Sequence, residues 1–330
     1  MQTIPSTRAV AFKGAKYVTP NRRGAALVAT STATSEVSTA SKKEIKLSGP
    51  EPQRFVVAEG ELTNVASAAF CAVARLGSGV FALGYKNSIV KDTPDNANEY
   101  SVTSLPLGFR TKETSKVALY PRPTEPITIY DSQCFNSRKI REAVCILDID
   151  AIFKPCPEGF TGWDEELSKF GITNTVTAAQ QIPFLVDPNH GIEMSDADEI
   201  VAFLFRNYGN NKIPLVLKKG LFNDVTAKIG TAPRKGMGEK YTGAPEKRPE
   251  MPLELWGYEG SPFSVIVREV LCELGISYLF KPTARGSPKR QQLFERRQLF
   301  QVPYLEDPNT GVAMFESKAI VEYLRKTYGA

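Results

Sequence analysis

The sequence contains two similar segments, and this internal repeat limits the possible folds more than any other feature. When Ile127–Tyr130 is placed over Leu253–Trp256, many later residues match in the same order. The matches include Arg141-Glu142 with Arg268-Glu269, Cys145 with Cys272, Phe153–Pro155 with Phe280–Pro282, Gln181–Pro183 with Gln301–Pro303, and Asp187–Asn189 with Asp307–Asn309. The loop in the middle is longer in the first copy. Each copy is therefore predicted to fold as the same supersecondary unit.

Both copies show the same alternation of apolar and polar stretches. An apolar strand meets a short polar turn, and a helix follows with apolar residues at helical spacing, such as Val267, Val270 and Leu274. A second strand, an Ile/Val-Pro strand, an Asp-Pro-Asn turn, a short strand and a last helix complete the unit. This order predicts an α/β fold in which residues 126–210 and 252–330 form two tandem modules, each a mixed sheet flanked by helices.

The first 45 residues are predicted to be a leader. This stretch is basic and rich in Ser, Thr and Ala, with Glu36 as its single acid before residue 44. Such a composition is typical of an organelle transit peptide. The abundance of Ser and Thr favours the plastid over the mitochondrion, and a plain disordered tail is the alternative.

Two further stretches lie outside the repeats. In residues 46–125, the apolar run Leu62–Tyr85 contains Arg75 and several glycines, so a membrane span is not favoured and a helix or helical hairpin packed on the first module is expected. The sequence leaves open whether this run touches a membrane. Residues 211–251 are rich in Gly, Pro and Lys towards their end, and they are predicted to be a linker.

Composition excludes several classes of function. His190 is the only histidine, which excludes multi-histidine metal sites and disfavours a Ser/His/Asp triad. The five cysteines are sparse and form no CxxC pair, so neither a disulfide framework nor a zinc site is predicted. Basic residues form no stripe with interleaved aromatics, which disfavours nucleic-acid binding.

Each copy carries a polar turn just before its first helix. The turn is Cys134–Ser137 in the first copy and Ser261–Ser264 in the second. Free backbone N–H groups and the helix dipole favour a thiolate at such a position. With Arg138 and Lys139 nearby, Cys134 is expected to ionise readily and act as a nucleophile. A serine here also has a purely structural use, as an N-cap.

This arrangement of strand, Cys- or Ser-containing turn, helix, strand, Val-Pro, strand, Glu-Ser and helix resembles the N-terminal, thioredoxin-like domain of glutathione transferases and the related glutaredoxins. More narrowly, it is similar to plastid proteins of plants and algae that carry two such domains in tandem. The resemblance covers about half of the chain, as two copies, and implies glutathione as the cofactor.

The resemblance implies roles for residues of the second copy. Ser261 or Ser264 would donate a hydrogen bond to the glutathione thiolate. Val302 would pair with the cysteinyl main chain of glutathione, and Pro303 would be cis. Glu316-Ser317 would bind the γ-glutamyl carboxylate at a helix start.

In the first copy, Cys134 resembles the nucleophile of a monothiol Cys-x-x-Ser glutaredoxin. Ile182-Pro183 keeps the cis-proline position, and Asp196 keeps the acid while the neighbouring hydroxyl is lost. Cys156 is a candidate resolving thiol. The remaining sulfur and imidazole side chains are predicted to be structural, with Cys71, Cys145 and Cys272 buried and His190 in a turn.

The leading interpretation is a glutathione-linked thiol redox protein of the plastid, with glutathione or protein thiols as partners. No all-helical domain follows Ala330, so conventional conjugation of electrophiles is not expected. The alternative is a non-catalytic thioredoxin-fold scaffold for protein contacts. A third hypothesis is iron–sulfur cluster handling by Cys134 and glutathione across a dimer. The sequence specifies neither a substrate nor an oligomeric state.

Overall fold

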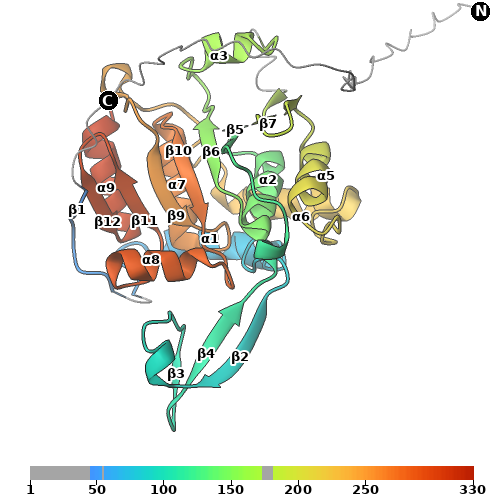
Figure 1. Cartoon of the computed structure of the whole chain (residues 1–330). Coiled ribbons are helices and arrows are strands. Elements are labelled where there is room, and N and C mark those ends of the chain that lie inside the picture. Colours follow the sequence, from blue (N-terminus) through green and yellow to red (C-terminus); the bar gives the residue numbers. More distant parts are fainter. Residues whose placement is uncertain (1–44, 54–55, 173–180) are drawn as a thin grey trace, which may run out of the picture. The chain divides into compact units, whose positions relative to one another are not determined.

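A computed structural model describes residues 45–53, 56–172 and 181–330 (Figure 1). The described residues belong to one compact unit. The predicted leader, except for Ile45, lies outside the described residues.

Two segments of the chain have the same order of helices and strands. The first comprises β5 (Ile127–Asp131), α2 (Phe135–Leu147), β6 (Ala151–Pro155), α3 (Asp164–Ser168), β7 (Phe184–Asp187), β8 (Ile192–Met194) and α5 (Ala197–Tyr208). The second comprises β9 (Leu253–Gly257), α7 (Pro262–Glu273), β10 (Tyr278–Pro282), α8 (Lys289–Arg297), β11 (Tyr304–Asp307), β12 (Val312–Phe315) and α9 (Ser317–Tyr328). The predicted mixed α/β architecture is therefore present.

The two segments share one mixed sheet. Its nine described strands run in the order β1-β12-β11-β9-β10-β6-β5-β7-β8, with β1 at Lys46–Leu47. In each segment the first two strands are parallel and the last two are antiparallel. The segments meet where β6 and β10 pair antiparallel, and the rings of Phe153 and Tyr278 stack there with centroids 5.5 Å apart. The strands of both segments thus form one continuous sheet, whereas the sequence predicted a separate sheet for each.

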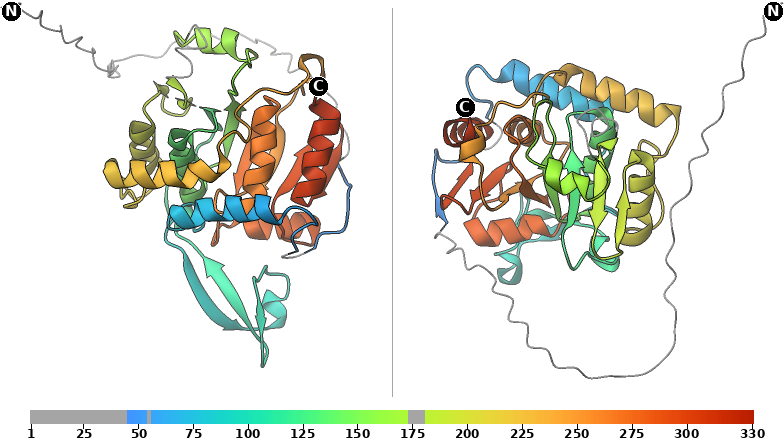
Figure 2. Two further views of the ribbon diagram at one scale, coloured as in Figure 1. Left: turned by 180° about the vertical axis from the view of Figure 1, so that it is seen from behind. Right: turned by 90° about the horizontal axis from the view of Figure 1, so that it is seen from above.

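Alternating side chains place helices on both faces of the sheet. In the second segment, Leu255 and Leu305 belong to the core cluster that contains the apolar side of α7 and α9. Their neighbours Trp256 and Tyr304 point the other way and pack with Leu293 of α8. This alternation follows from the two-residue period of a strand. Figure 2 shows α1 and α6 side by side, outside the helices that cover the sheet.

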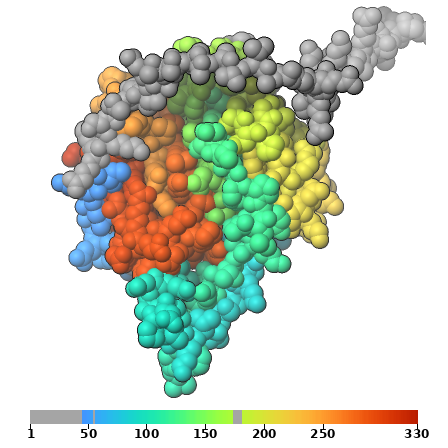
Figure 3. Space-filling model, viewed as in Figure 1, coloured from blue at the N-terminus to red at the C-terminus, as the bar shows by residue number. Residues whose placement is uncertain are grey.

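The extension before the first segment, expected to be helical or irregular, contains a helix and also a small sheet. Helix α1 (Leu62–Ala74) packs against α7 of the second segment and against α6, rather than on the first segment alone. After it comes a separate antiparallel sheet of β2 (Lys86–Lys91), β4 (Phe109–Thr114) and β3 (Ser104–Leu105). Figure 3 shows this sheet, in teal, beside the orange second segment. No helix within residues 45–53, 56–172 and 181–330 is long and apolar enough to cross a membrane.

The predicted linker is folded and held in place. Residues 211–251 contain α6 (Leu221–Thr231) and two short 3₁₀ turns. Arg234 is buried there and forms an ion pair with Glu269 of α7. Arg75, at the end of α1, makes the equivalent pair with Glu142 of α2. Because a buried carboxylate without a partner is costly, these two arginines hold the extension and the linker against matching positions of the repeat.

Candidate functional site

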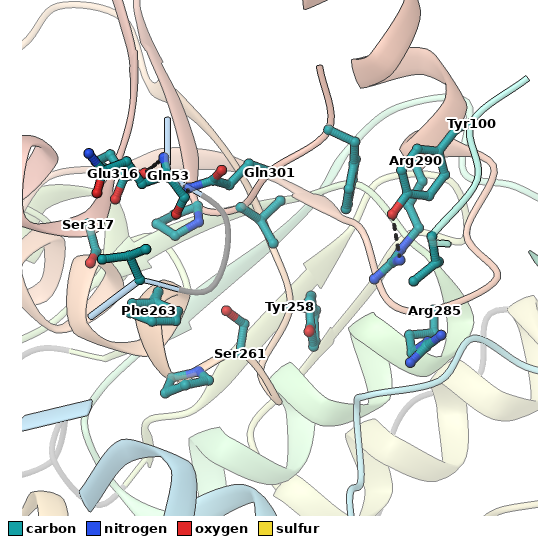
Figure 4. Close-up of a pocket in the computed structure, with 16 residues that line it drawn as sticks. Gln53, Tyr100, Tyr258, Ser261, Phe263, Arg285, Arg290, Gln301, Glu316 and Ser317 are labelled. Atoms are coloured by element: carbon teal, nitrogen blue, oxygen red, sulfur yellow. Dashed lines mark hydrogen bonds between the residues drawn. The ribbon is translucent and has the colours of Figure 1, made fainter. Parts of the chain in front are cut away.

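A cavity of about 390 Å³ opens in the second segment where α7 and α9 begin (Figure 4). It brings together residues that are far apart in the sequence. Five of the residues predicted for glutathione line it: Ser261, Val302, Pro303, Glu316 and Ser317.

The two serines of the second turn lie in different places. Ser261 caps α7, and its Oγ accepts a hydrogen bond from the Ser264 N–H at 3.3 Å. Although only 4 % exposed, Ser261 faces the cavity. Ser264 lies beneath the turn against Gly257 of β9 and does not line the cavity. Ser261 is thus the serine with access to a ligand.

Both Ile/Val-Pro peptide bonds are cis, as the resemblance implied. They are Ile182-Pro183 in the first segment and Val302-Pro303 in the second. Val302 and Pro303 form part of the cavity wall, whereas Ile182 and Pro183 do not line this cavity.

Glu316 leaves the start of α9 open. Its φ of 68° is in the left-handed region, and its side chain makes no capping hydrogen bond to its own helix. Instead, Oε1 accepts hydrogen bonds from the Gln53 backbone N–H at 2.7 Å and from Gln301 Nε2 at 2.6 Å. Helix-start amides without a side-chain cap favour an anion. Ser317, at the first position of α9, faces the cavity beside these amides.

The opposite end of the cavity carries positive charge. Arg285 and Arg290 both pair with the single carboxylate of Glu113, which leaves an excess of one guanidinium charge. Arg290 also stacks on Phe300, 4.7 Å from the ring centroid. Burial raises the pKa of Tyr258 despite the opposing effect of both arginines, so its phenol stays neutral. Figure 4 shows Glu316 and Arg290 at opposite sides of the cavity.

The sequence analysis missed several lining residues. Tyr100 and Val102 come from the extension and Gln53 from the segment near β1, and all three border the cavity. Neither stretch carries a family motif, so the sequence offered no signal for them. Arg285 and Arg290 lie in the variable part of the repeat, where the two copies do not match.

In the first segment, Cys134 caps α2. Its Sγ accepts a hydrogen bond from the Ser137 N–H at 3.4 Å, and its side chain is half-buried. The two cations expected to assist it are engaged elsewhere. Arg138 pairs with two buried glutamates, and Lys139 pairs with two aspartates at 3.2 and 2.6 Å. Both cations are therefore paired with carboxylates rather than with the Cys134 thiol.

Asp196 behaves differently from Glu316, its counterpart in the repeat. Its carboxylate caps its own helix α5 by accepting hydrogen bonds from the N–H groups of Asp198 and Glu199, both at 2.9 Å. The N-terminus of α5 is thus already capped by the carboxylate of Asp196. Residues 173–180, which precede Ile182, lie outside the described residues.

The other cysteines and the histidine have structural surroundings. Cys71, Cys145 and Cys272 are buried, as predicted, and all five cysteines are free thiols. Burial raises the pKa of Cys156 well above its ordinary value, which disfavours its thiolate. His190 lies in its turn and contacts Asp187 at 2.9 Å.

Within the residues that the structure describes, no group of three or more His, Cys, Asp or Glu residues is arranged to hold a metal ion.

One comparison with known protein families identifies a match within the second segment. Residues 255–330 match the family described as the glutathione S-transferase N-terminal domain. The glutathione S-transferase-like protein gedE of Aspergillus terreus (strain NIH 2624 / FGSC A1156) is 36% identical over 78 residues, which cover 24% of this chain and 34% of that protein. The chain thus spans about a third of this relative, and no solved structure matches. The matched residues form the second half of the sheet, so this part of the chain is similar to a glutathione S-transferase N-terminal domain and has the mixed α/β fold expected of one.

Proposed function

We propose that the cavity of the second segment binds glutathione and that the protein works in glutathione-linked thiol chemistry. One observation carries this proposal. Ser261, Val302-Pro303 and Glu316-Ser317 were selected from a resemblance in sequence, and they line one cavity. Stable packing of the core does not by itself require these separate loops to place their polar groups around one cavity.

The chemistry of the cavity suits the tripeptide. Glutathione has a carboxylate at each end, an ammonium beside the γ-glutamyl carboxylate, and a thiol in the middle. The open amides of α9 would take the γ-glutamyl carboxylate, and Glu316 would take the ammonium. Arg285 and Arg290 would attract the glycyl carboxylate at the far end. Ser261 would donate a hydrogen bond to the thiolate, which the start of α7 also favours.

The first segment would supply a nucleophile. We propose that the Cys134 thiolate attacks one sulfur of a disulfide, forms a mixed disulfide with it, and releases the other sulfur as a thiolate. A glutathione thiolate would then attack the mixed disulfide and release Cys134. Because Asp196 already caps α5, we assign the glutathione site to the second segment.

This function includes three finer proposals. The two segments are tandem copies of one glutathione-transferase N-terminal module, the partners are glutathione or protein thiols, and the protein works in the plastid. Their support is the repeat in the sequence, the shared order of elements, and the composition of the first 45 residues.

The test is titration calorimetry with reduced glutathione, using a matched pair of acid variants. Glu316→Ala removes the acceptor at the cavity and should weaken binding about tenfold or more, the usual effect of losing a charged hydrogen bond. Asp196→Ala removes the equivalent acid of the first segment and should leave glutathione binding unchanged. Equal affinities for wild type and Glu316→Ala would contradict the assignment. A wild-type protein that binds no glutathione would favour the scaffold alternative.

The nucleophile has a separate test. Wild type is incubated with oxidised glutathione and its peptides are analysed by mass spectrometry. The glutathione adduct is expected on Cys134, and Cys134→Ser should abolish it while Cys156→Ser retains it. An adduct that persists in Cys134→Ser would exclude this role.

A further inference from the structure

Residues 45–53, which we call the strap, run along the edge of the sheet towards the cavity. Strand β1 pairs parallel with β12 through hydrogen bonds from the Lys46 N–H to Gly311 O at 2.9 Å and from the Ser48 N–H to Ala313 O at 2.7 Å. The strap then passes through Pro50 and Pro52 and places Gln53 in the cavity wall. A piece of the chain far from the second segment in sequence thus reaches the site.

At the cavity, the strap donates a hydrogen bond to one carboxylate oxygen of Glu316. The Gln53 N–H donates to Glu316 Oε1 at 2.7 Å, and the Gln301 side chain donates to the same oxygen at 2.6 Å. Gln301 Nε2 also reaches Gln53 O at 3.4 Å. Figure 4 shows these three residues grouped at one end of the cavity. A protein N–H therefore stands where an ammonium group of a ligand would donate.

Ile45 packs on the cluster that contains Trp256 and Tyr304, but the rest of the strap is mostly exposed. Leu47 is 53% exposed, and Gly49, Glu51 and Gln53 are exposed as well. A segment with little buried apolar surface and solvent-exposed hydrogen bonds opens at low cost compared with the core. Release of the strap would remove the Gln53 donor from Glu316 Oε1 and leave Gln301 as the remaining donor to that oxygen.

We propose that the strap is an internal competitor for the glutathione site, and that the site binds its ligand better when Gln53 leaves Glu316. This inference rests on the proposed function. The apparent dissociation constant of a ligand increases as the fraction of binding-competent protein decreases. A strap that is bound nine-tenths of the time weakens binding about tenfold by this relation.

The test uses full-length chains in which proline removes one backbone N–H at a time. Gln53→Pro removes the donor to Glu316, and Ser48→Pro removes the donor to Ala313. Glu51→Pro is the matched control, because the Glu51 N–H makes no hydrogen bond within the described residues. Calorimetry with glutathione should give a dissociation constant about tenfold lower for both release variants. The control should stay within about twofold of wild type.

Hydrogen exchange of the wild-type protein gives an independent measurement. If the strap competes with glutathione, the amides of Ser48 and Gln53 should exchange faster when glutathione is added. Slower exchange would mean that the strap closes on the ligand, and it would overturn the inference.

The outcomes separate this inference from the proposed function. Equal dissociation constants in all chains would refute competition while leaving the glutathione site intact. Weaker binding by the release variants would show that the strap helps to hold the ligand, which also refutes competition. Absence of binding in every chain would refute both the site and its competitor.

Discussion

Replacing Arg75 with alanine should strongly destabilise the fold, because this side chain joins three helices inside the protein. Arg75 is fully buried at the end of α1. Its guanidinium bonds to Glu142 of α2 at 2.8 Å, to Thr226 of α6 at 2.6 Å, and to the backbone oxygen of Val216 at 3.0 Å. The substitution would remove all of these contacts together.

The expected magnitude follows from burial. Removing one partner of a buried ion pair typically costs about 3–5 kcal/mol, since the other charge stays buried. Glu142 keeps a second partner, Arg138, at 3.0 Å. We therefore expect Arg75→Ala to lower the free energy of unfolding by about 3 kcal/mol, near the lower end of that range. Urea denaturation measures this change through the midpoint and slope of the transition.

A matched control separates the effect of burial on stability from the effect of the ion-pair distance. Arg325 and Glu273 form an ion pair of similar length, 2.9 Å, but the Arg325 side chain is 58% exposed. Exposed pairs contribute about 0–1 kcal/mol, so Arg325→Ala should lower the free energy of unfolding by less than about 1 kcal/mol. If Arg75→Ala costs no more than Arg325→Ala, the argument from burial is wrong.

Three further predictions concern acid stability, thiol reactivity and backbone conformation. Burial would raise the pKa of Asp187, but hydrogen bonds from three neighbouring side chains outweigh it and lower the pKa. The carboxylate therefore adds stability above its unfolded pKa, and the stability difference between wild type and Asp187→Asn in urea should shrink as the pH falls from 7 to 3. Iodoacetamide at neutral pH should label half-buried Cys134 before Cys272, whose pKa is raised to about 12 by burial; peptide mass spectrometry that finds equal rates would contradict this. Gly238→Ala would bring a Cβ within 2.5 Å of a backbone oxygen of α7, whereas Gly236→Ala meets open space at a similar positive φ. In denaturant melts, Gly238→Ala should lower the free energy of unfolding by more than about 2 kcal/mol and Gly236→Ala by about 1 kcal/mol. Equal losses would refute the steric argument.

Two segments outside the repeat show what a local sequence pattern leaves out. Arg75 and the glycines around it argued against a membrane span, and the structure gives this arginine a partner, Glu142, in a distant helix. The Gly/Pro-rich stretch before β9 was predicted to be a linker, yet Arg234 holds it to Glu269. Composition describes the local preference of a stretch, whereas a buried ion pair depends on a partner that only tertiary structure supplies.

The residues that line the cavity also divide into those that local motifs predicted and those that only the tertiary structure brings there. The serine turn and the Val-Pro and Glu-Ser pairs were predicted because each lies within a few residues of a recognisable motif. Tyr100 and Gln53 were not predicted, because they reach the cavity from the extension and the strap. A local motif carries no information about which distant loop will cover it.

The sequence alone determined the order of strands and helices in each segment, because hydrophobic periodicity and turn residues act over short distances. Tertiary structure decided that β6 and β10 join the segments into one sheet. It also decided how the two equivalent acids are used. Asp196, in an extended conformation with φ −82°, caps its own helix, whereas Glu316, with φ 68°, turns away from its helix towards Gln53. The backbone angle at each position depends on the surrounding packing, which the local sequence does not contain.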